Sequence, residues 1–132
     1  MEVGKKNVTF GWAWLLAGLI VGAVMGMWSF GGPLPSPVGD YTSLPRRLLR
    51  LAHIAFIALA IINILYGYEI DKARLSNQLK RTGSVCMMLG AILMPIFLIA
   101  AAFIEPLKYL TMISATLVIV AVAVMVVGRV KG

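Results

Sequence analysis

Residues 46–69 read RRLLRLAHIAFIALAIINILYGYE, and this stretch decides the fold class. It begins with three arginines, Arg46, Arg47 and Arg50, and continues as about twenty mainly apolar residues, the length that an α-helix needs to cross a bilayer. The run also carries His53, the single histidine of the chain. An ionisable side chain inside a membrane span is costly and usually has a partner. His53 is therefore the first candidate for a functional residue.

The rest of the chain has the same apolar character. Its 132 residues are 61% hydrophobic and 13% charged, with a mean hydropathy of +0.94. A water-soluble domain of this size must cover a large surface with polar groups and cannot be so apolar. Four apolar runs of spanning length account for the excess: residues 10–30, 48–68, 85–104 and 110–127. We predict an all-α integral membrane four-helix bundle that forms a single transmembrane domain over residues 1–132.

The net charge of +7 is explained by the membrane and not by nucleic acid. Nearly all Lys and Arg residues lie at the ends of the predicted spans, where they meet lipid headgroups and set the topology. The lipid bilayer is thus the expected partner of these charges, and no nucleic-acid partner is expected. Eight basic residues lie on the side of the two termini and four on the other side, which predicts that both termini are cytoplasmic.

Several residues of the spans predict helix packing. Gly18, Gly22 and Gly26 recur at every fourth position of the first span and share one face, which favours close helix contact within the chain or with another protomer or subunit. Asn63 is expected to bond across to another helix. Pro95 predicts a kink in the third span, because proline lacks an N–H and clashes with the preceding turn.

Aromatic residues mark the two ends of the first span. Trp12 and Trp14 lie near its start, and Trp28 and Phe30 lie at its end. These positions are typical of the aromatic belts at the two interfaces of a bilayer.

The predicted topology brings the candidate site residues to one membrane face. Arg46, Arg50 and His53 share a face of the second helix, because they are spaced four and three apart. Glu105 and Tyr109 lie at the same depth, in the connection to the fourth span.

Three kinds of chemistry suit this set of residues. His53 could ligate a heme or a chlorophyll, with Arg46 or Arg50 on the heme propionates. His53, Arg50 and Tyr109 could instead hydrogen-bond the carbonyls of a quinone. An ion pair of His53 with Glu105 would suit proton movement. A purely structural role is also consistent with the sequence, since a histidine and arginines this shallow can reach interfacial water and lipid phosphates.

A catalytic role for this chain is not expected. No Ser/His/Asp or Cys/His arrangement, phosphate-binding loop or set of metal ligands can be assembled from its residues. The leading hypothesis is a small non-catalytic subunit of a larger respiratory or photosynthetic electron-transfer complex, which holds a heme, chlorophyll or quinone near His53. Its partners would be other membrane subunits or a second copy, packed through the first helix. The alternatives are a homo-oligomeric transporter or channel that uses His53 and Glu105, and a standalone structural membrane protein.

Three short motifs also carry a resemblance. GWAWLLAGLIVGAVMG, RRLLRLAHI with the downstream Asn63, and LMP in the third span are together similar to a group of small four-span bacterial inner-membrane proteins. The resemblance covers most of the chain. It implies a four-span fold and the bacterial inner membrane, and it implies no activity.

Overall fold

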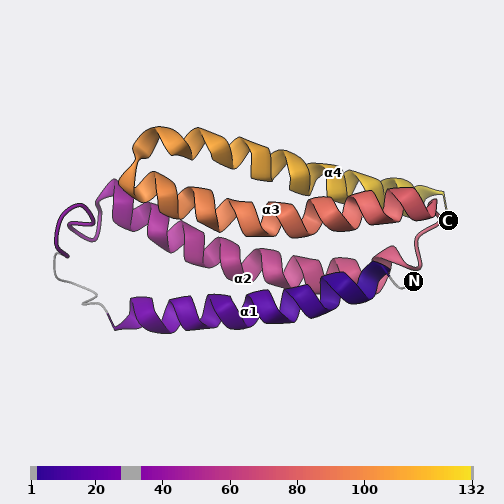
Figure 1. Ribbon diagram of the computed structural model, residues 1–132, viewed down its shortest axis with the longest axis horizontal. Coiled ribbons are helices and arrows are strands. Elements are labelled where there is room, and N and C mark those ends of the chain that lie inside the picture. Colours follow the sequence, from indigo (N-terminus) through magenta and orange to yellow (C-terminus); the bar gives the residue numbers. More distant parts are fainter. Residues whose placement is uncertain (1–2, 28–33, 132) are drawn as a thin grey trace.

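A computed structural model describes residues 3–27 and 34–131 of the protein. The chain runs up and down through four α-helices, α1 (Val3–Gly26), α2 (Leu44–Ile70), α3 (Asn77–Phe103) and α4 (Thr111–Val130), with a short 3-10 helix, η1 (Glu105–Leu110), before α4 (Figure 1). All four α-helices belong to segments that are long and apolar enough to cross a membrane. The predicted all-α four-helix membrane bundle is therefore confirmed.

The helices extend past the predicted spans. α1 begins at Val3 instead of Phe10, and α3 begins at Asn77 instead of Val85. Hydropathy marks only the part of a helix that faces lipid, whereas the backbone stays helical into the interface, where Ser76 caps α3 by accepting from the Leu79 amide. Residues 28–30, with Trp28 and Phe30, lie outside the described part of the chain.

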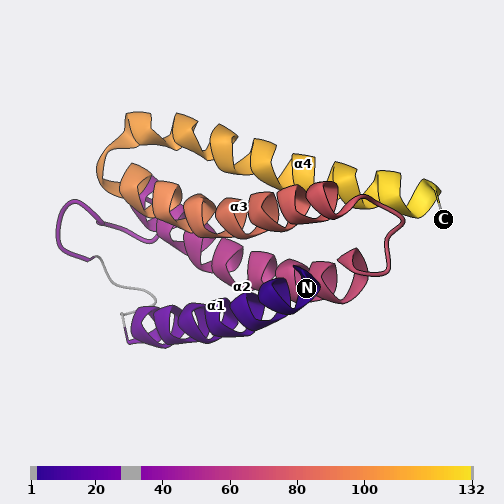
Figure 2. The ribbon, with the colours of Figure 1, turned by 45° about the vertical axis from the view of Figure 1, so that its right-hand side comes forward.

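The helices pack in chain order, so that α1 and α4 lie on opposite sides of the molecule (Figures 1 and 2). In the most apolar segments of α2 and α3, 33% and 39% of the residues are buried, against 11% in each outer helix. α2 and α3 therefore form the centre, and α1 and α4 present most of their surface to lipid. We call the end with Val3, Lys131 and residues 71–76 the termini end, and the opposite end, with residues 34–43 and 104–110, the loop end.

A buried group of polar side chains ties α1, α2 and α3 together. Asn7 Nδ2 donates to Asn63 Oδ1 at 3.0 Å and to the Ser84 carbonyl at 3.4 Å, and Ser84 Oγ donates back to Asn7 Oδ1. Asn63 Nδ2 in turn donates to the Leu59 and Met87 carbonyls. We call Asn7, Asn63 and Ser84 the polar lock. Its three side chains are fully buried or nearly so, and each makes hydrogen bonds within the protein, as a lipid environment requires.

α1 and α2 approach each other most closely along a row of three glycines that are spaced seven residues apart. A Cβ on Gly4 would collide with the Gly67 carbonyl, a Cβ on Gly11 would lie 2.8 Å from the Ala60 carbonyl, and one on Gly18 would lie 3.1 Å from Phe56 Cβ. A seven-residue spacing keeps contacts on one seam when two helices cross at a shallow left-handed angle.

Only Gly18 of the predicted row Gly18, Gly22 and Gly26 therefore lies on this seam. Gly22 faces the His53 side chain, and a Cβ on Gly26 would have no neighbour within 4 Å. Gly26 does not serve helix packing within the described chain. Within the described chain, the contact between α1 and α2 follows the row Gly4, Gly11 and Gly18, and packing of the four-residue row against another chain stays a prediction.

Trp14 lies between the helices rather than in an aromatic belt. Its Nε1 donates to the Ala91 carbonyl at 3.1 Å, and its ring stacks on Phe56 at 4.6 Å and on Phe10 at 5.5 Å. Ala91 is four residues before Pro95, which has no N–H to offer the Ala91 carbonyl. Trp14 thus satisfies the one carbonyl that Pro95 deprives of its helical partner, and α3 continues through the proline as a single helix.

We expect Trp14→Phe to cost about 1 kcal/mol more unfolding free energy in the natural chain than in the Pro95→Ala background. Alanine at position 95 supplies the N–H that bonds the Ala91 carbonyl, so the indole is no longer needed there. A double-mutant cycle, measured by unfolding in mixed micelles, gives this coupling and removes the cost of the lost ring stacking. Equal costs in the two backgrounds would contradict the assignment.

A second prediction separates the two glycine rows. Gly11→Ala should lower the free energy of unfolding by about 1–3 kcal/mol, because its Cβ meets backbone that can move only if the helices separate. Gly26→Ala is the matched control and should cause no loss, since its Cβ enters open space. A larger loss at Gly26 than at Gly11, in the same micelle assay, would show that the four-residue row is the packing row.

Candidate functional site

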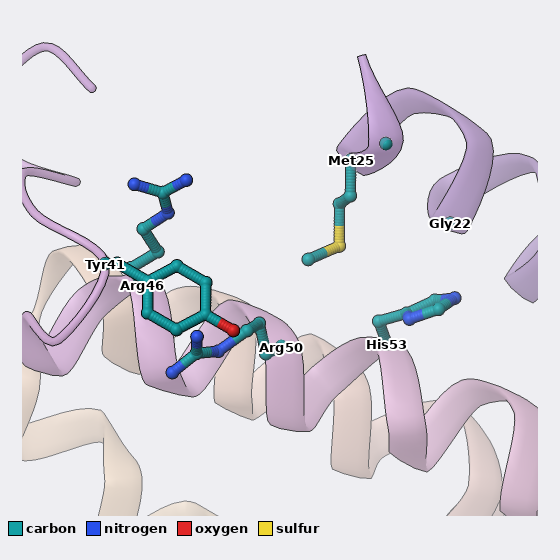
Figure 3. A pocket seen from close by; sticks show the side chains of 7 residues that line it. Gly22, Met25, Tyr41, Arg46, Arg50 and His53 are labelled. Carbon is teal, nitrogen blue, oxygen red and sulfur yellow. The ribbon is translucent and has the colours of Figure 1, made fainter. Parts of the chain in front are cut away.

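A polar pocket of about 240 Å³ opens at the loop end between α1 and α2. Residues from both helices and from the preceding turn line it: Gly22, Met25, Gly26, Tyr41, Arg46, Arg50 and His53. Figure 3 shows Arg46, Tyr41 and Arg50 at one side, His53 at the other, and Met25 of α1 projecting between them. We call this space the polar pocket.

α2 supplies the charged wall of the polar pocket. Ser43 caps the helix by accepting from the Arg46 amide, and Pro45 occupies the first turn, where a missing N–H does no harm. The spacing then places Arg46, Arg50 and His53 on one face, as predicted, with His53 about 10 Å further along the helix axis than Arg46. Arg46 is 5% exposed, so its guanidinium is buried in the protein, whereas Arg50 and His53 are half-buried.

The turn before α2 adds Tyr41, which the sequence-based site did not include. Leu34 and Gly39 pair as an isolated bridge, with the Leu34 amide donating to the Gly39 carbonyl at 2.9 Å, and Gly39 adopts a positive φ of 68° that suits glycine. The turn places the Tyr41 ring 4.0 Å from the Arg50 guanidinium carbon and 5.3 Å from that of Arg46. Both arginines thus lie within cation–π distance of one aromatic ring.

Tyr41 was missed because irregular chain has no periodicity from which to infer contacts. Its nearness to the arginines in sequence was the available signal, since it lies one short turn before the helix that carries them. A tyrosine in this position adds both a ring for cation–π contact and a hydroxyl.

His53 points at the backbone of α1. A Cβ on Gly22 would clash with His53 Nε2 and lie 3.0 Å from Cε1, so this edge of the imidazole rests on the glycine. A metal on Nε2 would need a bond of about 2 Å, followed by the full width of a tetrapyrrole. α1 occupies that space. The residues of the pocket therefore do not fit the heme or the chlorophyll that the sequence allowed.

Two predicted site residues lie elsewhere. Glu105 bonds Lys108 at 2.7 Å, and Tyr109 is 70% exposed with the Lys108 ammonium 5.5 Å from its ring. Neither lines the polar pocket, and the ion pair expected between His53 and Glu105 is not formed. The reason is that η1 packs mainly on α3 and α4, so the two residues lie at the loop end but away from the side of the bundle that carries His53.

A second, apolar pocket of about 340 Å³ adjoins the polar pocket and shares His53 and Met25 with it. Its walls come from α1, α2, α3 and the turn before α2. They are otherwise aliphatic or aromatic: Ile20, Val21, Val24, Val38, Leu49, Ala52, Phe56, Ile99 and Phe103. We call this space the apolar pocket. The two together form a site with a donor-rich head and a hydrocarbon body.

The side chains of the polar pocket suit the binding of an oxygen-bearing group. Arginine offers only donors, so the polar pocket suits carbonyl, carboxylate or phosphate oxygens. Among residues 3–27 and 34–131, no cluster of His, Cys, Asp and Glu could hold a metal ion.

Comparison with protein-family models, with curated proteins and with solved structures finds no match. The site geometry is accordingly the basis for the function.

The contact of His53 with Gly22 predicts the outcome of a heme titration. Hemin added to the purified protein in detergent should give the spectrum of free hemin in that detergent, because Nε2 is covered by α1. The His53→Ala variant should behave identically. A reducible, shifted Soret band that is lost in His53→Ala would overturn this reading of the site.

Proposed function

We propose that this chain is a small non-catalytic membrane subunit that binds a quinone at the loop end, as part of a bacterial electron-transfer assembly. The ring carbonyls of the quinone lie in the polar pocket, and its isoprenoid tail lies in the apolar pocket. The observation that carries the proposal is the continuity of the two pockets through His53 and Met25.

The donor set supports a quinone head. Its carbonyl oxygens accept hydrogen bonds, and the polar pocket offers donors from Arg50, from His53 and from the Tyr41 hydroxyl. The ring contact with Tyr41 restrains Arg50, which reduces the entropy lost when the guanidinium binds a ligand. Of the three cofactors considered from sequence, the quinone is the one that needs no space at Nε2.

The lipid-like tail is supported by the lining of the apolar pocket. That pocket meets the polar pocket near the interface, where the head of an amphiphile would lie while its tail points into the bilayer. Phe56 forms part of the wall and also stacks on Trp14, so the inner side of the pocket is held by the centre of the bundle.

A transporter or channel has less support. Glu105 is engaged by Lys108, and the polar lock deeper in the bundle bonds each of its side chains to protein partners. A proton or ion path through His53 would need polar groups that stay available along the bundle axis.

We place both termini in the cytoplasm of a bacterium and the two pockets at the outer face of its inner membrane. Eight Lys and Arg lie at the termini end and four at the loop end, which favours this orientation by the positive-inside rule. Three of the four at the loop end, Arg46, Arg47 and Arg50, belong to the start of α2. Two of these three line the polar pocket, so ligand binding gives a reason for arginines on the disfavoured side.

Quinone binding can be tested with a matched pair of arginine variants. We expect Arg50→Gln and His53→Leu each to weaken the binding of a short-chain ubiquinone analogue about tenfold. The first replaces a charged guanidinium by a shorter neutral amide, and the second removes the ring N–H donor. Arg47→Gln removes the same charge from an exposed position of the same helix that does not line the pocket, and should leave binding unchanged. Quenching of tryptophan fluorescence in detergent measures the affinity. Equal affinities for Arg50→Gln and Arg47→Gln would contradict the site.

The assembly is tested separately by isolating the chain from native membranes in a mild detergent. Recovery with redox subunits and with bound quinone supports the proposal. Recovery as a homo-oligomer alone would reject the electron-transfer setting, whatever the outcome for quinone binding.

A further inference from the structure

A groove of about 260 Å³ lies between α1 and α3 at the termini end, far along the helices from the two pockets of the loop end. It is lined by residues of the first turn of α1 and of the second to fourth turns of α3: Val3, Lys6, Arg81, Ser84, Val85 and Met88. We call it the basic groove. The proposed function makes no use of it.

The mouth of the basic groove is cationic. Lys6 comes from α1 and Arg81 from α3, and both are exposed. The described carboxylates of this end are engaged elsewhere, since Glu69 pairs with Lys72 and Arg129, and Asp71 Oδ2 accepts from the Gly4 amide. The groove therefore presents two positive charges at the level of lipid headgroups.

Helix direction adds to this potential. α1 and α3 both begin at the termini end, so the amide-bearing, positive end of each helix dipole lies on the same side as Lys6 and Arg81 (Figure 1). The Gly4 amide of α1 already donates to Asp71 and the Leu79 amide of α3 to Ser76, so Lys6 and Arg81 supply the main attraction for a phosphate.

The floor of the groove is apolar. On α3, Arg81, Val85 and Met88 follow at spacings of four and three, so the lining passes from a cation to hydrocarbon over about 10 Å along one face. Ser84 also lines the groove, but its hydroxyl is bonded to Asn7 and is buried. The groove thus matches a molecule with a phosphate head and an acyl chain.

We infer that the basic groove binds an anionic phospholipid of the leaflet next to the termini. Its phosphate lies between Lys6 and Arg81, and one acyl chain follows Val85 and Met88. α1 and α3 make few direct contacts compared with α1 and α2, and this groove lies beside the polar lock that joins them. The lipid therefore strengthens the attachment of α1 to α3.

The test compares two double variants that remove the same charge. Lys6→Gln with Arg81→Gln empties the groove of its cations, whereas Lys5→Gln with Arg74→Gln removes two exposed cations of the same end that do not line it. The protein is transferred from nanodiscs of mixed phosphatidylglycerol and phosphatidylcholine into detergent, and retained lipid is measured by native mass spectrometry.

We expect the unmodified chain to retain phosphatidylglycerol in preference to phosphatidylcholine. In the groove variant, the ratio of retained phosphatidylglycerol to phosphatidylcholine should fall about tenfold or more. In the control variant, this ratio should stay unchanged. The melting temperature in detergent should rise with added phosphatidylglycerol for the unmodified chain and the control, but not for the groove variant.

Three results would overturn the inference. They are an equal loss in both double variants, the absence of a preference for phosphatidylglycerol in the unmodified chain, and equal stabilisation by inorganic phosphate alone. The second and third use the unmodified chain, so they decide the matter even if a variant folds poorly. Arg50→Gln should leave this lipid preference intact, which keeps the outcome separate from that of the quinone proposal.

Discussion

A polar group inside a bilayer has no water to bond, so it must find its partner within the protein. This constraint accounts for the contacts that hold α1 against the centre of the bundle. The polar lock joins Asn7 of α1 to Asn63 of α2 and Ser84 of α3. Further along α1, the Trp14 indole donates a hydrogen bond to the Ala91 carbonyl, which has no helical donor because residue 95 is a proline. A proline in one helix is thus compensated by a tryptophan in another.

The same contacts explain where the bundle stays open. α1 is tied to both central helices from Asn7 to Trp14, whereas beyond Trp14 its glycines face α2, and the polar and apolar pockets lie between the helices there. Gly22 and Gly26 line that opening rather than a helix contact. Gly18 does bring the two helices together, whereas Gly22 and Gly26 border the space beside Arg50 and His53.

Part of the candidate site could be predicted from helical spacing. Arg46, Arg50 and His53 line one pocket because residues three and four apart share a helix face. Glu105 and Tyr109 do not line this pocket, since topology gives the end of the bundle at which a residue lies but not the side that it faces. Tyr41 could not be found in this way. Its position depends on the Leu34–Gly39 turn, and irregular backbone has no repeat that relates sequence distance to contact.

The sequence by itself determined the fold class, the four spans and the shared side of the two termini. These depend on hydropathy, length and the parity of the crossings, and each of them is a local or additive property of the chain. Only the tertiary structure decided the glycine seam at seven-residue spacing, the pairing of Trp14 with Ala91 and the contact of His53 with Gly22. These depend on how each helix is rotated about its axis. In an apolar sequence every face of a helix is compatible with lipid, so the rotation is settled by the packing and hydrogen bonds between helices.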